Sequence, residues 1–195
     1  WMASLAGFGK LHDVLGLFME RFRILGGYAA LAENPESAAT VAADFLRQHG
    51  SRTVFISKLP TGLTQPLEKK LKEMGLQVYS YDSSEDPVHV VKMVDAGIST
   101  AAAAVAETGT LVEVAFDDVE RLVSSLPKTY VCFVNGSTVV KSVYMTSGLL
   151  RSAMERDRVS VTFISGPSRS GDIEQRLVLG IHGPHHVLSV VCSWL

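Results

Sequence analysis

Apolar side chains along this chain follow two alternating patterns. Spacings of three and four residues, which are typical of amphipathic helices, occur in residues 10–25, 34–50 and 67–75. Short β-branched or aromatic runs, which are typical of buried strands, lie between and beyond them, at residues 28–31, 53–57, 77–81 and 97–99. Strands that alternate with helices favour parallel pairing, so the pattern predicts a layered α/β fold with a mostly parallel sheet flanked by helices.

The second half of the chain adds further strands and one predicted β-hairpin. Apolar runs predict strands at residues 111–114, 130–134, 159–164 and 187–191. Asn135-Gly136 is a tight-turn dipeptide, so we expect residues 138–141 to return as an antiparallel neighbour of the preceding strand. The sheet should therefore contain at least one antiparallel pair.

The length of 195 residues suits one domain with a small N-terminal appendage. The first predicted helix ends at the glycine pair Gly26-Gly27, which offers a natural division. Residues 1–27 then form an N-terminal helical segment, and residues 28–195 form the domain.

Charge and composition argue against several classes of protein. The formal net charge is -2 and the basic residues form no stripe, so nucleic acid is not an expected partner. No apolar run reaches the length of a membrane span, and the N-terminus lacks a signal-peptide pattern, so we expect a cytoplasmic protein without a membrane partner. Cys132 and Cys192 lie in apolar runs without CxxC spacing, so we expect no iron–sulfur cluster or other cofactor in this chain.

A glycine- and serine-rich loop follows the predicted strand at residues 159–164. Its sequence, over residues 165–171, is Ser-Gly-Pro-Ser-Arg-Ser-Gly. Backbone amides of such a loop can converge on an anion, and Gly166, Ser168 and Arg169 are candidate ligand-binding residues. The alternative is an ordinary turn from a strand into a helix, with glycine for backbone freedom and proline for rigidity.

An acidic pair and a histidine follow this loop. Asp172 and Glu174 either form ion pairs with Arg169 or orient its guanidinium toward a ligand, and Asp172 is also a candidate cap of a short helix. His182 precedes Gly183-Pro184 and either fixes that turn by a hydrogen bond or contributes to the ligand site. The histidine spacings fit no metal-binding pattern, so no metal site is expected.

The turn Glu107-Thr108-Gly109-Thr110 is the second candidate for chemistry. It follows a run of small residues, where a poorly hydrated carboxylate should have a raised pKa, so Glu107 is a candidate general base or nucleophile. The alternative is that Glu107 caps the backbone amides of its own turn. Thr108, Gly109 and Thr110 have the composition of an anion-binding turn, and Gly109 is expected to have a positive φ.

These two stretches resemble the signatures of one family. The string FISGPSRSGDIEQ…VLGIHGP is similar to the C-terminal signature of the LUD-domain family, the lactate-utilisation protein C group, and Ala106–Thr110 resembles its other signature. The resemblance implies the fold shared by sugar-phosphate isomerases, CoA transferases and formyltetrahydrofolate cyclo-ligase. Ligands of that fold bind at the carboxyl ends of parallel strands, where both turns are expected to meet. The chain departs from the family pattern at Glu113 and at Phe116-Asp117-Asp118.

The resemblance also implies a function. The expected role is that of a non-redox accessory subunit in an iron–sulfur L-lactate oxidation system, with an anion-binding cleft and with the clusters in partner oxidoreductase subunits. The alternative is a stand-alone transferase or ligase that uses Glu107 as its nucleophile or acid–base group, by analogy with CoA transferases. A third interpretation is a homo-oligomeric binding module whose N-terminal helix is an interface.

Overall fold

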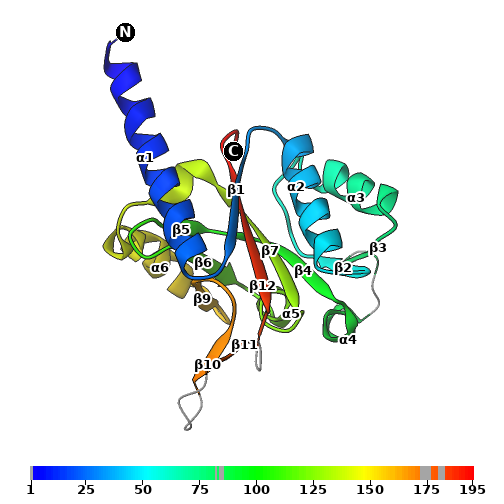
Figure 1. Ribbon diagram of the computed structural model, residues 1–195. Coiled ribbons are helices and arrows are strands. Elements are labelled where there is room, and N and C mark those ends of the chain that lie inside the picture. The colour runs from blue at the N-terminus through cyan, green and yellow to red at the C-terminus, as the bar shows by residue number, and fades with distance from the viewer. Residues whose placement is uncertain (1, 82, 84–85, 172–176, 180–182) are drawn as a thin grey trace.

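A fully parallel sheet forms the centre of the protein. The computed structural model describes residues 2–81, 83, 86–171, 177–179 and 183–195. Six strands pair in the order β1-β12-β7-β4-β2-β3 (Figure 1). Their bounds are β1 Tyr28–Ala32, β2 Thr53–Ile56, β3 Gln77–Ser80, β4 Ala96–Ala101, β7 Thr129–Asn135 and β12 His186–Cys192. The predicted α/β class with a mostly parallel sheet is confirmed.

A smaller sheet packs beside the central one. Its order is β8-β5-β6-β9, with β5 Ala103–Val105, β6 Thr110–Ala115, β8 Val139–Val140 and β9 Ser160–Ile164. A separate antiparallel pair, β10 Arg169–Gly171 and β11 Leu177–Leu179, projects from the body at the bottom of Figure 1.

Helices and the smaller sheet cover both faces of the central sheet. The helices are α1 Met2–Ile24, α2 Pro35–Gln48, α3 Thr64–Glu73, α4 Pro87–Met93, α5 Asp118–Val123 and α6 Ser147–Met154, with short 3₁₀ turns η1 Gly136–Thr138 and η2 Val143–Thr146. Helices α2 and α3 cover one face, and α1, α4, α5 and the smaller sheet cover the other (Figure 1). None of the described helices is long and apolar enough to cross a membrane.

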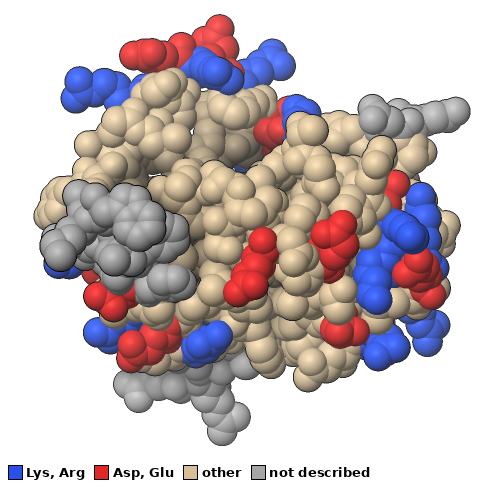
Figure 2. Space-filling view, turned by 90° about the horizontal axis from the view of Figure 1, so that it is seen from above, with Lys and Arg blue, Asp and Glu red and all other residues tan. Residues whose placement is uncertain are grey.

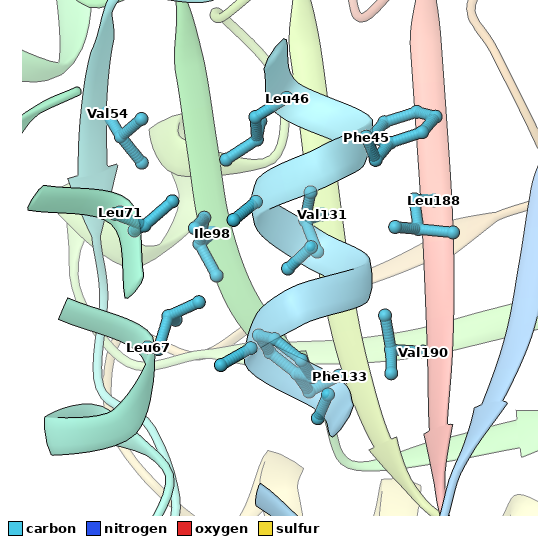
Figure 3. Packing of buried hydrophobic residues seen from close by; sticks show 14 of the residues in the cluster. Phe45, Leu46, Val54, Leu67, Leu71, Ile98, Val131, Phe133, Leu188 and Val190 are labelled. Atoms are coloured by element: carbon cyan, nitrogen blue, oxygen red, sulfur yellow. The ribbon is translucent and has the colours of Figure 1, made fainter. Parts of the chain in front are cut away.

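Strand β7 shows how the two faces are filled. Val131 and Phe133 point to α2 and α3, where Figure 3 shows them in one apolar cluster with Leu188. Tyr130 and Cys132 point to the opposite face, where they pack with α1 and the smaller sheet. This alternation is the period-two pattern of a strand that is buried on both faces.

Two local signals in the sequence have the predicted structure. The side chain of Asn34 accepts a hydrogen bond from Ser37 N at 2.8 Å and caps α2, with Pro35 in its first turn. Cys132 and Cys192 are buried free thiols, as expected. On the face shown in Figure 2, outside the grey atoms, basic and acidic side chains are interspersed toward the edges, and isolated acidic side chains lie nearer the middle.

The structure differs from the sequence predictions at the start of the first helix and at the predicted hairpin. The first helix begins at Met2 rather than at residue 10. The hairpin predicted at Asn135-Gly136 is wrong, because η1 turns the chain out of the central sheet and β8 pairs in parallel with β5. An antiparallel hairpin does exist, between β5 and β6. The division at residue 27 stays a prediction, although Phe18 and Phe22 of α1 are fully buried in the same core as β7.

Candidate functional site

The two signature stretches meet through a hydrogen bond between their hydroxyl groups. Strands β6 and β9 are antiparallel and place Leu111 opposite Ile164, so the turn before β6 lies beside the loop after β9. Thr110 Oγ1 lies 2.7 Å from Ser165 Oγ and donates to Thr108 Oγ1 at 2.8 Å. The expectation that the two stretches converge is therefore confirmed in the described part of both.

Both stretches also pack against the C-terminal end of α1. Gly109 has a φ of +59°, as predicted, and a Cβ on it would lie 2.5 Å from Phe22 N. Gly166 has a φ of +89°, and a Cβ there would lie 2.8 Å from the carbonyl oxygen of Leu25. Each glycine thus combines a left-handed backbone with a close approach to helix backbone that no larger residue permits.

Arg169 is engaged at this same helix end. Gly27 N donates to Phe22 O at 3.0 Å, which closes α1 in a Schellman-type turn. The guanidinium of Arg169 donates to Leu25 O at 2.6 Å, so its positive charge lies at the negative end of the helix dipole. A direct role of Arg169 in ligand binding stays a prediction.

A cavity of about 350 Å³ lies beside the second signature loop. The loop, the end of α5 and strand β9 enclose it, and its described lining includes Arg121, Ser124, Ser125, Thr162, Phe163, Ile164, Ser165, Gly166, Pro167, Ser168, Gly183 and Pro184. Of the predicted ligand-binding residues, Gly166 and Ser168 line it. Arg121 contributes the one charged side chain in this described lining, and it forms an exposed ion pair with Asp118 at 2.8 Å. Such a pair is weak and leaves the guanidinium available to a ligand.

The position of this cavity differs from the expected one. Ser124 and Ser125 lie in the connection from α5 to β7, and Gly183-Pro184 lie just before β12, so the cavity lies near the amino ends of two parallel strands. The expectation of a cleft at the carboxyl ends is wrong for this cavity, because the signature stretches flank antiparallel strands of the smaller sheet. A second cavity of about 270 Å³ does lie at the carboxyl end of β4, with Ala101, Ala102 and Arg156 in its lining.

Glu107 has a different environment from the predicted one. Its Oε1 accepts hydrogen bonds from Val143 N at 2.9 Å and from Ser142 Oγ at 2.8 Å. These bonds hold the pKa of the Glu107 carboxyl below its ordinary value, so the expected rise is wrong. The carboxylate therefore accepts hydrogen bonds from the segment after β8, whereas the alternative prediction is that it caps the amides of its own turn. Its proposed catalytic role is untested, and it does not line the cavity beside the signature loop.

Three predicted ligand-binding residues lie outside the described part of the chain. These are Asp172, Glu174 and His182, and the helix predicted to start at Asp172 lies there too. Among the described residues, no group of three histidine, cysteine or acidic side chains is arranged to hold a metal ion.

Glu113 departs from the family pattern in the sequence, where no role is predicted for it. It lies on β6, where every other residue except Thr110 is apolar. Its side chain is charged in water, yet it is only 3% exposed. Oε1 accepts hydrogen bonds from Ser99 Oγ at 2.7 Å and from Tyr130 OH at 3.0 Å. Burial raises the pKa of the Glu113 carboxyl above its ordinary value, and the hydroxyl groups of Ser124, Ser99 and Tyr130 only partly oppose this effect.

We expect this buried acid to make stability fall with rising pH. Since the folded-state pKa of Glu113 lies above the ordinary value of 4.5, its contribution to the free energy of unfolding is complete below that pH and decreases as the pH passes through the raised pKa. Glu113→Gln cannot ionise and should lack this decrease. Urea unfolding of both proteins from about pH 4 to about pH 9 measures the difference. A difference that stays constant over this range would show that burial does not perturb Glu113.

Comparison with known proteins agrees with the fold and with both signature stretches. The family model described as LUD domain matches residues 15–191. Lactate utilization protein C of Bacillus subtilis (strain 168) is 33% identical over 171 residues, which are 81% of this chain and 71% of that protein. Lactate utilization protein C of Geobacillus sp. (strain WCH70) is 31% identical over 137 residues, 68% of this chain and 57% of that protein.

A solved structure supports the same assignment at the level of fold. A DUF162 family protein from Deinococcus radiodurans, known from a crystal structure, superposes with a TM-score of 0.66 over 94% of this chain and 98% of that one, at 20% identity. The family match includes the part of α1 that supports both glycine turns, the turns themselves and all but the last residue of strand β12. This chain therefore belongs to the LUD domain family.

Proposed function

We propose that this protein acts in lactate utilisation and that the cavity beside the second signature loop binds a small carboxylate. The observation that carries the proposal is a cavity lined by the second family signature, whose loop is held by the first signature through the Thr110–Ser165 hydrogen bond. The relatives named lactate utilization protein C support the process. The cavity volume of about 350 Å³ is large enough to hold a small carboxylate.

Arg121 is the proposed anion-binding group. Its guanidinium presents several donors in a plane, which matches the two oxygens of a carboxylate. The cavity lining adds the hydroxyl groups of Ser124, Ser165 and Ser168 as further hydrogen-bonding partners. In this arrangement Arg169 holds the loop on α1, and Arg121 holds the ligand.

The proposed role includes no redox centre in this chain. Burial raises the pKa of the Cys132 thiol above its ordinary value and that of Cys192 to about 12. The two thiols also lie in clusters on opposite faces of the central sheet. Cluster ligands are thiolates, so these residues do not fit an iron–sulfur cluster. The electron transfer of lactate oxidation then belongs to partner subunits.

L-Lactate should bind and stabilise the protein, and Arg121→Gln should weaken this binding roughly 10- to 100-fold, because a hydrogen-bonded charge contributes about 1.5–3 kcal/mol. Titration calorimetry with both proteins measures the change. Arg156→Gln is the matched control, since that guanidinium lines the second cavity. Loss of lactate binding in Arg156→Gln but not in Arg121→Gln would contradict the proposal, because it would show that lactate binds in the second cavity.

The partnership is tested separately by anaerobic purification from the source cells with iron analysis of the eluate. Co-elution with iron–sulfur subunits and lactate oxidation activity is the expected result. Elution of this chain alone, with no iron and no activity, would contradict the accessory role while leaving the carboxylate site open to the calorimetric test.

A further inference from the structure

The carboxylate of Glu113 is only half satisfied. Oε1 accepts two hydrogen bonds, from Ser99 and Tyr130, whereas Oε2 is buried and has no hydrogen-bond partner in the described structure. A buried carboxylate oxygen without a partner costs free energy in either protonation state. Such an atom in a native protein calls for an explanation, and a neighbouring hydroxyl that turns toward it when a ligand binds is one.

Glu113 lies directly behind the wall of the cavity beside the second signature loop. In the β6–β9 register it is opposite Thr162, and opposite residues of an antiparallel pair point to the same face of the sheet. Thr162 and Ser124 both line the cavity, and Ser124 is itself only 5% exposed. The polar end of the cavity wall therefore adjoins the buried acid.

Ser124 lies between the cavity and the Glu113 carboxylate. Its hydroxyl is close enough to Glu113 to oppose the effect of burial on the pKa of the acid. In the described structure this hydroxyl donates to Arg121 O at 3.3 Å, a long hydrogen bond, and makes none with Oε2. Rotation about the Cβ–Oγ bond would direct the same proton to Oε2 and turn a lone pair of Oγ toward the cavity.

We infer that the cavity recognises a small 2-hydroxycarboxylate, whose carboxylate binds Arg121 and whose hydroxyl donates to Ser124, backed by Glu113. This inference rests on the proposed carboxylate site and adds the group that distinguishes its ligand. Arg121 and Ser124 are three residues apart at the end of α5, where side chains one helical turn apart lie about 5–6 Å from each other. A 2-hydroxy acid carries its two polar groups on adjacent carbons and can reach both.

Propionate provides the direct test, because it is lactate without the hydroxyl. Sites built to hydrogen-bond a hydroxyl discriminate strongly against analogues that lack it. In titration calorimetry on the full chain, L-lactate should bind at least about tenfold more tightly than propionate. Ser124→Ala should reduce this ratio to near one with propionate affinity unchanged, and Ser124→Thr should restore most of it.

Two further variants separate the roles. Ser125→Ala removes a neighbouring hydroxyl that is bonded to Arg121 O at 2.9 Å, and it should keep the preference for lactate. Glu113→Leu, checked for folding by its melting curve, should lose the preference as Ser124→Ala does; if it does not fold, the Ser124 variants still decide.

The outcomes distinguish this inference from the proposed function. Equal affinity of the wild type for L-lactate and propionate would overturn the hydroxyl recognition and leave the carboxylate site intact. A preference that survives in Ser124→Ala would also overturn it. Failure of both acids to bind would overturn the proposed function together with this inference.

Discussion

Gly109→Ala should destabilise the protein by about 2–5 kcal/mol, since it adds a left-handed backbone penalty to a steric clash. The new methyl group would lie 2.5 Å from Phe22 N and 2.6 Å from the carbonyl carbon of Arg21. Both atoms belong to helix backbone, which cannot rotate away as a side chain can. Either α1 or the signature turn must therefore move, and urea unfolding will measure the cost.

Gly75→Ala is the matched control for this change. Gly75 also has a left-handed backbone, with a φ of +79°, but no atom lies within 4 Å of the position of its Cβ. It should lose only about 1–2 kcal/mol, from the backbone penalty alone. Equal losses in the two variants would show that Gly109 is required for its φ and that the contact with α1 contributes nothing.

Phe22→Ala should cost about 3–5 kcal/mol, the usual range for removing a fully buried aromatic ring. Phe22 is 0% exposed, packs on Phe18 with ring centroids 5.7 Å apart, and lies under both Gly27 and the signature turn at Gly109. Its loss should also weaken lactate binding, because the loop that lines the cavity packs at Gly166 against this end of α1. Chemical denaturation and calorimetry measure the two effects.

Phe116→Ala is the comparison for Phe22. That ring is 40% exposed and contacts the guanidinium of Arg156. Its removal should cost only about 1 kcal/mol or less, since it leaves no core cavity. A similarly small loss for Phe22→Ala would mean that α1 is an appendage and does not support the signature turns.

The local elements were predictable where neighbouring residues determine them. Asn34 and Pro35 start a helix through groups in the same turn, and Gly109 provides the positive φ that its turn requires. The class of the fold followed from the alternation of strand and helix patterns. These signals depend on short stretches of chain, so the sequence carries them directly.

The predicted hairpin failed because tertiary pairing decided where the chain goes after β7. Asn135 accepts a hydrogen bond from Ser137 N at 2.8 Å and starts η1 instead of closing a two-residue turn. Beyond it, Val139 and Val140 find their partners in β5, in the smaller sheet. A turn dipeptide indicates that the chain reverses or bends, but it does not identify the strand that pairs next.

The electrostatics of the site were the least predictable part. Glu107 follows a run of small residues in the sequence, but its neighbours in space are Ser142 and Val143, which lower its pKa. Glu113 shows the opposite case, because burial raises its pKa although Ser99 and Tyr130, from two strands of the other sheet, donate hydrogen bonds to it. A pKa depends on contacts between distant segments, so composition near a residue is a poor guide to it.

A crystal structure of the protein with L-lactate tests the central claim most directly. We predict that lactate occupies the cavity between α5 and residues 165–168, with its carboxylate on Arg121 and its hydroxyl on Ser124. Lactate in the second cavity beside Arg156, or no bound lactate at a concentration that saturates the protein in calorimetry, would contradict the proposed site.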